Sequence, residues 1–241
     1  YSITYVEGIY IIAKASIGVT VPASAYFKVY GDSDLLMTAE ATGIYGEAIT
    51  IAFVRQSGED AGLYDIIGAA SLNGNYAAYI EGDSGKDKFE IRRRDITVVA
   101  NPAGHIYGEA DATLTFTVNN LPSGYTVLGS LTREAGRNAG SYAILQGSVT
   151  DENNPNYAIT FVGNTYTIYR SPITVTAIDT GHTYGDPEAP LCFDSGDIAE
   201  GDILQGTPER EAGDAYRPEG YAITQGSVTD ANNPNYRITF V

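Results

Sequence analysis

The feature that most limits the fold of this chain is an internal repeat of about 77 residues. A Tyr-Gly dipeptide occurs three times at that spacing, at Tyr30-Gly31, Tyr107-Gly108 and Tyr184-Gly185. The segment 146–162 recurs at 225–241 with 15 of its 17 positions identical, two residues later than the spacing alone requires. A unit of this size can bury its own small core. We therefore expect tandem domains rather than a solenoid whose short repeats share one core.

The repeat divides the chain into four segments. Residues 1–16 match 157–171 and are interpreted as the closing strands of a preceding repeat. Three repeats follow at 17–94, which is diverged, at 95–171, and at 172–241, which lacks its closing strand. A fragment boundary is the simpler explanation of the two incomplete ends. The alternative is that a strand from one molecule completes a repeat of another by strand addition.

The local sequence pattern predicts strands throughout the chain. Segments such as 96–100 and 46–55 alternate apolar and polar residues or carry β-branched residues with a period of two. No segment has a sustained apolar stripe of helical period with caps. We predict an all-β fold of tandem small β-sandwich (immunoglobulin-like) repeats in an elongated array, with β-grasp-like repeats as the alternative. The junctions at 92–94 and 169–172 contain no flexible Gly/Ser linker and are expected to be stiff.

The charge and composition exclude several classes of function. The net charge of −16 argues against nucleic acid, whose phosphates need a basic surface, and against anionic lipid. No apolar run approaches the ~20 residues of a membrane span, so we expect no direct membrane insertion. The single cysteine, Cys192, excludes an intrachain disulfide and is interpreted as a core residue between Leu191 and Phe193.

The same composition leaves little material for catalysis. With two His and one Cys, nucleophilic triads and zinc sites are nearly excluded. His105 and His182 occupy one repeat position, which Lys28 fills in the first repeat, and a catalytic or zinc-binding histidine is not normally exchanged for lysine. A carboxylate pair for glycoside cleavage needs a deep cleft that small β repeats rarely supply. We expect that the chain is not an enzyme.

The repeated motifs follow one another in a fixed order. Each full copy has Ile-Thr-Val, Tyr-Gly with an acidic residue, Arg-Glu-Ala-Gly, Gln-Gly-Ser and Asn-Tyr-x-Ile-Thr-Phe-Val. This succession resembles the MBG domain of the YGX type, nearly throughout the second and third repeats and more loosely in the first. The resemblance implies tandem arrays on large secreted or wall-anchored bacterial proteins similar to adhesins. It thus implies an extracellular location at the bacterial cell surface or cell wall, and it brings no catalytic or ligand residues.

An acidic pair follows each Tyr-Gly dipeptide, and its two carboxylates are two residues apart. Such a pair in a loop suits a hard cation, although each loop alone lacks the six or so oxygen ligands that Ca²⁺ takes. The alternative is a solvated turn. The candidate calcium ligands are Asp32, Asp34, Glu109, Asp111, Asp186 and Glu188. No other cofactor is expected.

Two further sets of polar residues recur in the repeats. The first is interpreted as a turn with side-chain bonds to the backbone, with a cation- or sugar-binding loop as the alternative: Asp151, Asn153, Asn154 and Asn156 recur as Asp230, Asn232, Asn233 and Asn235. The second follows a turn and resembles a tyrosine corner, in which the hydroxyl bonds back to the backbone: Tyr64, Tyr142 and Tyr221.

Two functions remain open from the sequence. In the first, the repeats are a stiff stalk of an adhesin that presents a distal binding domain. In the second, the repeats bind a host glycan, mucin or surface protein directly, and their near-identical loops suit weak multivalent binding. Accessory domains of an extracellular polysaccharide-acting enzyme are a distant third. The expected partners are therefore neighbouring repeats of the parent chain and a host glycan or protein, and we expect a monomer.

Overall fold

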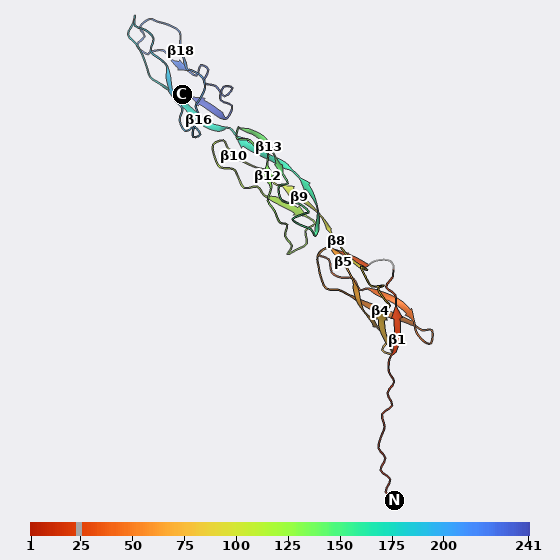
Figure 1. Cartoon of the computed structure of the whole chain (residues 1–241). Helices are drawn as coiled ribbons and strands as arrows, with labels where there is room; N and C mark the ends of the chain where they lie inside the picture. Colours follow the sequence, from red (N-terminus) through yellow and green to blue (C-terminus); the bar gives the residue numbers. More distant parts are fainter. Residues whose placement is uncertain (23–25) are drawn as a thin grey trace. The chain divides into compact units, whose positions relative to one another are not determined.

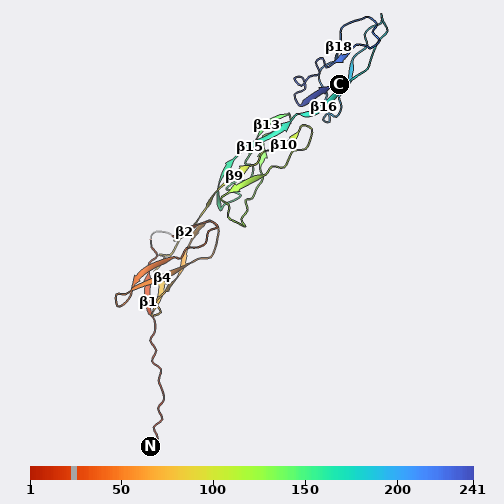
Figure 2. The ribbon, with the colours of Figure 1, turned by 180° about the vertical axis from the view of Figure 1, so that it is seen from behind.

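The computed structural model describes residues 1–22 and 26–241. All of the regular structure in these residues is strand, and neither view of the ribbon contains a helix (Figures 1 and 2). The prediction of an all-β fold with tandem β-rich repeats is confirmed. A β-grasp repeat needs a helix, and the described residues have none. Accordingly, no described segment is a helix that could cross a membrane.

The first repeat folds into three small sheets. Their strand orders are β1-β7, β3-β4-β6 and β2-β8-β5. The segment predicted as a strand at 46–55 forms β4, whose alternate residues Ile49, Ile51 and Phe53 point into the core. The strand β8 adds Phe89 and Ile91 to the same core. The strands are β1 (Ala15–Val19), β2 (Tyr26–Val29), β3 (Thr38–Thr42), β4 (Ala48–Arg55), β5 (Gly62–Tyr64), β6 (Ile66–Ser71), β7 (Tyr76–Ile80) and β8 (Phe89–Arg92).

The second repeat folds into two sheets, with strand orders β11-β9-β14 and β10-β15-β13-β12. Alternation again decides which side chains are buried, because Val98 and Ala100 on β9 and Tyr166 and Ile168 on β15 are almost fully enclosed. The strands are β9 (Arg94–Ala100), β10 (Ala103–Ile106), β11 (Phe116–Asn119), β12 (Thr132–Arg133), β13 (Gly140–Leu145), β14 (Tyr157–Val162) and β15 (Asn164–Tyr169).

The third repeat has fewer strands than the other two. Its sheets are β17-β16-β20 and β18-β19. Its core contains Val175, Val228 and Tyr236. Cys192, interpreted from the sequence as a core residue, is exposed instead, because alternation along β17 turns Phe193 inward. The strands are β16 (Ser171–Ile178), β17 (Cys192–Asp194), β18 (Glu209–Arg210), β19 (Ile223–Thr224) and β20 (Tyr236–Phe240).

Parallel strand pairs are a feature that the sandwich prediction did not include. The pairs β1/β7 and β16/β20 are parallel, and so are β2/β8 and β10/β15. An immunoglobulin-like sandwich consists of antiparallel sheets, and a parallel pair needs a long connection between its strands. Most of each repeat serves as that connection. The first strand of a repeat can therefore pair only after nearly the whole repeat has been traversed.

By their internal contacts, the residues form two compact units. The boundary runs through the second repeat rather than between repeats, where independent modules would place it. Both repeat junctions consequently lie inside one unit each, the first junction in the first unit and the second junction in the second. The first unit contains Tyr1–Ile96, Asn120–Thr126 and Asp151–Thr160, and the second unit contains Thr97–Asn119, Val127–Thr150 and Phe161–Val241.

Candidate functional site

The Tyr-Gly tyrosine of a repeat packs on the Asn-Tyr motif of the next repeat. Within the first unit, the rings of Tyr30 and Tyr157 lie 5.4 Å apart at 89°. Within the second unit, Tyr107 and Tyr236 lie 5.5 Å apart at 83°. This edge-to-face arrangement is favourable for aromatic pairs. The two most regular motifs of the sequence thus meet at the junctions between repeats.

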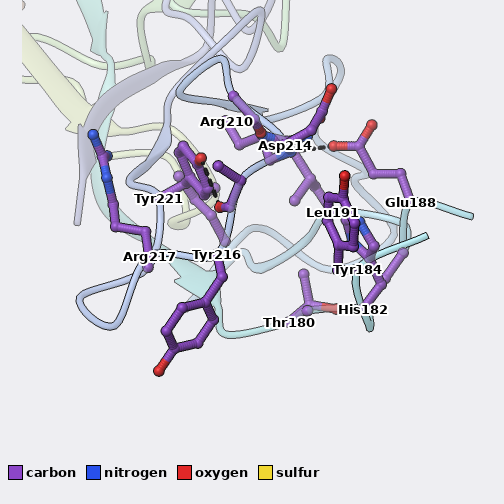
Figure 3. Close-up of a pocket in the computed structure, with 16 residues that line it drawn as sticks. Thr180, His182, Tyr184, Glu188, Leu191, Arg210, Asp214, Tyr216, Arg217 and Tyr221 are labelled. Carbon is purple, nitrogen blue, oxygen red and sulfur yellow. Dashed lines mark hydrogen bonds and ion pairs between the residues drawn. The ribbon is translucent and has the colours of Figure 1, made fainter. Parts of the chain in front are cut away.

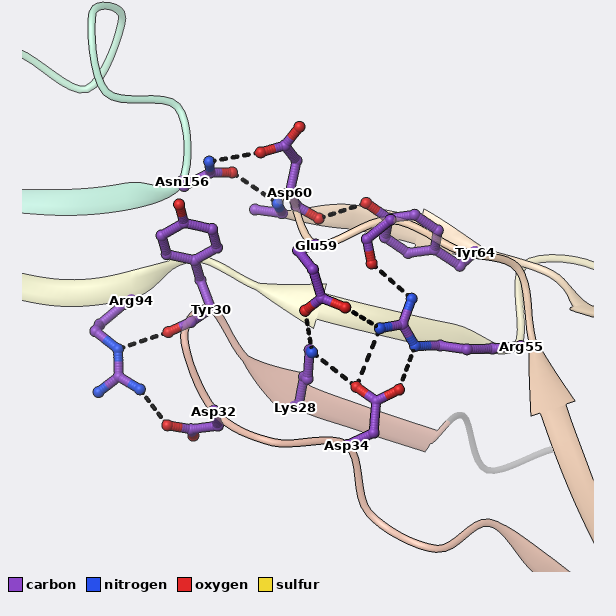
Figure 4. A network of polar contacts seen from close by, with 12 residues as sticks. Lys28, Tyr30, Asp32, Asp34, Arg55, Glu59, Asp60, Tyr64, Arg94 and Asn156 are labelled. Carbon is purple, nitrogen blue, oxygen red and sulfur yellow. Dashed lines mark hydrogen bonds and ion pairs between the residues drawn. The ribbon is translucent and has the colours of Figure 1, made fainter. Parts of the chain in front are cut away.

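The asparagine of the Asn-Tyr motif fastens the same junctions by hydrogen bonds. The Oδ1 atom of Asn156 accepts the backbone N–H of Ala61 at 2.7 Å, and its Nδ2 group donates to Asp60 at 2.9 Å (Figure 4). In the second unit, Asn235 accepts the N–H of Ala139 at 2.8 Å and donates to the side chain of Asn138 at 3.2 Å. Because both hydrogen bonds recur 77 to 79 residues apart, the junction is a repeated structure.

The glycine of the Tyr-Gly dipeptide allows the next repeat to approach. Gly31 and Gly108 have φ angles of +83° and +92°, a left-handed conformation that favours glycine. A Cβ atom on Gly31 would lie 2.8 Å from Pro122, and one on Gly108 would lie 3.1 Å from Ala199. Gly185 has the same conformation, with φ +95°, but a Cβ there would meet nothing within 4 Å. Two constraints therefore act on the first two glycines and one on the third.

The chain passes between repeats through a single residue. Arg93 separates β8 from β9, and Arg170 separates β15 from β16. Each arginine reaches the aspartate that opens the Asn-rich turn of the next repeat, with N–O distances of 2.5 Å to Asp151 and 3.5 Å to Asp230. Exposed ion pairs contribute about 0–1 kcal/mol. The short connection itself, rather than these pairs, restricts the junction.

The two junctions differ at one equivalent position of the incoming repeat. In the first unit, Tyr125 packs edge-on against Tyr30 at 5.2 Å and 79°. In the second unit, Asp202 accepts hydrogen bonds from the hydroxyls of Tyr107 at 2.8 Å and Tyr236 at 2.6 Å. Burial, and then the bond to Asp202, raises the pKa of Tyr236 to about 12, and the same causes raise the pKa of Tyr107. One junction is therefore wholly aromatic and the other contains a carboxylate.

In each acidic pair predicted to bind calcium, the second carboxylate contacts an arginine. Asp34 receives the Nε of Arg55 at 2.7 Å, and Asp111 receives that of Arg133 at 2.9 Å. Glu188 pairs with Arg210 in the third repeat. The hydrogen bond from Arg55, with a further one from Lys28, lowers the pKa of Asp34 (Figure 4). A cation at these positions would have to displace the arginine.

The first carboxylate of each pair lies elsewhere. Asp32 pairs with Arg94, Glu109 accepts the N–H of Ile106 at 3.3 Å, and Asp186 is exposed in a turn. Among residues 1–22 and 26–241, no group of three or more His, Cys, Asp or Glu side chains is placed to hold a metal ion. The geometry favours the solvated turn with an arginine partner, and calcium binding stays an untested prediction.

The arginine of the Arg-Glu-Ala-Gly motif and its equivalent in the first repeat organise the end of each repeat. The guanidinium carbon of Arg55 lies 4.7 Å from the centre of the Phe89 ring, and that of Arg133 lies 4.8 Å from the centre of Tyr166. Such cation–π contacts stabilise most where water is excluded. In both repeats the aromatic partner comes from the closing strand, β8 or β15. Each arginine therefore links the acidic loop to the last strand of its repeat.

The three predicted corner tyrosines make the expected bond to the backbone. The hydroxyl of Tyr64 donates to the carbonyl of Asp60 at 2.7 Å, and that of Tyr142 donates to Asn138 at 2.8 Å. Tyr221 reaches back six residues, to Ala215 at 3.0 Å, because the third repeat contains the two-residue insertion. These tyrosines hold the turn that carries the asparagine-bonded N–H of each junction.

The Asn-rich turns have the contacts of the structural interpretation. The carboxylates of Asp151 and Asp230 accept the N–H groups of Ile159 and Ile238, both at 2.8 Å. The buried amide of Asn233 accepts the N–H of Gln205 at 2.7 Å and donates to its carbonyl at 2.9 Å. Side-chain atoms that satisfy the backbone in this way are engaged within the turn.

The sequence analysis missed the junction contacts, although a signal was present. It assigned most tyrosines to cores or corners and gave no role to the Tyr-Gly tyrosines or to the motif arginines. Both recur in register with the Asn-Tyr motif. A pair of motifs that recur together but cannot meet within one repeat indicates a contact between repeats.

A family model described as MBG domain (YGX type) matches the chain twice, at residues 96–167 and 173–241. Each matched range contains a Tyr-Gly dipeptide and an Asn-Tyr motif. Searches of the curated proteins and of the solved structures found no match.

Proposed function

Because the chain belongs to the family of MBG domains (YGX type), we propose that its repeats are a stalk of a bacterial surface adhesin. The stalk is a spacer that presents a binding domain elsewhere in the parent protein. The family match itself supports a tandem repeat region of a surface protein, and MBG repeats are not typical catalytic domains. The acidic surface suits dense display outside the cell, because like charges keep neighbouring molecules apart.

The recurrence of one junction carries this proposal. Interfaces between domains of one chain are by default small and mobile. Here each junction has an aromatic pair, an asparagine bonded to the preceding repeat and a one-residue connection. A spacer must transmit position and force from one repeat to the next, and contacts of this kind restrict the hinge that a short linker alone would leave.

Direct glycan binding is the competing function, and one observation weighs against a multivalent form of it. The third repeat has a cavity of ≈ 320 Å³ lined by Tyr184, Tyr221 and Arg210. At the equivalent positions of the other two repeats, buried Phe89 and Tyr166 occupy this space. Equivalent sugar pockets in all three repeats would require those buried rings to leave.

Binding assays on the intact chain test the proposal. A stalk is expected to give no saturable binding to arrays of host glycans, to mucins or to extracellular matrix proteins. The matched control carries Tyr184→Ala and Tyr216→Ala, which remove two exposed rings without touching a core. Saturable binding that this variant loses would overturn the stalk in favour of a direct binding module.

A further inference from the structure

The third repeat has an open slot where the other repeats have their closing strand. In the second repeat, β15 lies between β10, to which it is parallel, and β13, to which it is antiparallel. In the first repeat, β8 lies in the same way between β2 and β5. The equivalent flanks of the third repeat, residues 180–183 and 219–224, have no strand between them in the described chain.

The walls of this slot are ready for a strand. The two flanks line the ≈ 320 Å³ cavity through Thr180, Gly181 and His182 on one side and Tyr221 and Ile223 on the other (Figure 3). Ile223 is only partly buried, whereas its equivalent under β15, Ile144, is 2% exposed. The apolar floor of the repeat is present but uncovered.

A glycine records the shape of the missing backbone. A Cβ atom on Gly104 of β10 would lie 2.3 Å from the carbonyl oxygen of Thr167 in the closing strand. Its equivalent in the third repeat, Gly181, would meet nothing within 4 Å. The close approach that this glycine permits in the second repeat is therefore unused in the third.

The polar groups of the slot indicate which side chain fits. In the second repeat, the hydroxyl of Tyr166 lies 2.7 Å from Nδ1 of His105 and accepts the N–H of Ala112 at 2.8 Å. The third repeat has the same groups, His182 and Ala189, at the wall of the cavity. The first repeat instead combines Phe89 with Lys28. The slot of the third repeat thus suits a strand whose inward residue is tyrosine.

The N-terminal segment of the chain has that sequence and is unused. Residues 5–14 align without a gap with 161–170, so that Tyr10 corresponds to Tyr166 and Ile12 to Ile168. All residues from 1 to 14 are exposed and form no strand in the described structure (Figures 1 and 2). Tyr10 is 91% exposed and Ile12 85% exposed, whereas Tyr166 and Ile168 are 0% and 2% exposed.

We propose that residues 9–12 of one chain enter the slot of the third repeat of a second copy of this chain. By equivalence with β15, Tyr10 pairs with Thr180 in parallel and with Tyr221 in antiparallel register, and Ile12 lies beside His182. The main-chain hydrogen bonds give affinity, and the pockets for Tyr10 and Ile12 give specificity. Because each copy has one strand and one slot, the assembly is head-to-tail and open. This inference does not depend on the stalk function.

Light scattering of the intact chain at rising concentration is the first test. The wild-type chain is expected to form dimers and longer oligomers as the concentration increases. Ile12→Asp points a charge into the slot and is expected to leave a monomer at all concentrations. Its matched control, Ile11→Asp, changes the adjacent residue, which points away from the slot like Thr167, and is expected to keep the oligomers.

A complementation experiment tests the polarity of the contact. Gly181→Val blocks the slot but faces open space in the isolated chain, so the variant is expected to fold and to remain monomeric. A mixture of Ile12→Asp and Gly181→Val chains has one working slot and one working strand, and is expected to give a 1:1 dimer and nothing larger. A wild-type chain that stays monomeric, or protection of residues 9–12 from hydrogen exchange that does not depend on concentration, would overturn the proposal.

Discussion

The first and second junctions share one frame and differ in one contact. In both, the Tyr-Gly tyrosine meets the buried tyrosine of the Asn-Tyr motif, and the neighbouring asparagine bonds to the preceding repeat. The remaining side of the Tyr-Gly tyrosine is covered by the Tyr125 ring in the first junction and by the Asp202 carboxylate in the second. The comparison separates what builds a junction from what adjusts it.

The equivalent end of the third repeat shows the frame without its neighbour. Tyr184 is 80% exposed there, although its dipeptide is the same. The Tyr-Gly motif therefore does not serve the core of its own repeat. It supplies one half of a contact, and the Asn-Tyr motif of the following repeat supplies the other half.

Removal of the shared tyrosine should have the largest effect at both junctions. Tyr157→Ala and Tyr236→Ala each empty a site that is 4% or 3% exposed, and each should reduce the free energy of unfolding by about 3–5 kcal/mol. Chemical denaturation measures this loss. Tyr184→Ala, at an exposed ring, should change stability by less than about 0.5 kcal/mol. Equal losses for the three variants would contradict the shared frame.

The variable contact should affect only the second junction. Asp202→Ala leaves two tyrosine hydroxyls without their charged acceptor and should cost about 1–3 kcal/mol in unfolding free energy. Asp202→Tyr introduces the residue of the first junction and should recover part of that loss through ring contacts. If Asp202→Tyr is at least as destabilising as Asp202→Ala, the two junctions are not interchangeable.

The three glycines of the Tyr-Gly dipeptides should rank by what their Cβ would meet. Alanine at each position has a left-handed backbone cost of about 1–2 kcal/mol. Gly31→Ala adds a contact at 2.8 Å and Gly108→Ala one at 3.1 Å, while Gly185→Ala adds none. Stability should therefore decrease most for Gly31→Ala and least for Gly185→Ala, as thermal unfolding can measure. A Gly185→Ala variant as unstable as Gly31→Ala would show that only the backbone matters.

Alkaline pH should distinguish the junctions by the smallest effect, which is absent at neutral pH. Because the pKa of Tyr236 is raised from 10.0 to about 12, the folded state holds this proton more tightly than the unfolded state. Its contribution to stability is complete below pH 10 and is lost as the pH rises from 10 to 12. Tyr236→Phe should remove this part of the pH dependence, and an unchanged slope would contradict the assignment.

The repeat period and strand alternation were sufficient to predict the fold class. The spacing of 77 residues predicts tandem units, and period-two segments such as 46–55 predict strands. The parallel pairs could not be predicted this way, because a strand has the same alternation whichever direction its partner runs. Cys192 was misplaced for a related reason, since a one-residue shift in register exchanges the inner and outer faces.

The candidate sites show a similar division. The tyrosine corners follow from local sequence, because the hydroxyl reaches a carbonyl only four to six residues away. The partner of Asp34 or Asp111 lies 21 or 22 residues away on another strand, so spacing alone could not distinguish an arginine pair from a cation loop. The junction contacts span about 95 residues. They depend on how one repeat meets the next, which no single repeat encodes.

The distance distribution across the first junction tests the central claim that the Tyr-Gly and Asn-Tyr motifs lock neighbouring repeats together. Spin labels at the exposed positions Ile67 and Glu152, with Cys192→Ser to remove the native thiol, both lie in the first unit. Pulsed electron resonance should give one narrow distribution, which Tyr30→Ala with Asn156→Ala broadens and Tyr184→Ala leaves unchanged. A distribution already broad without these substitutions, or one that stays narrow with both, would contradict the account.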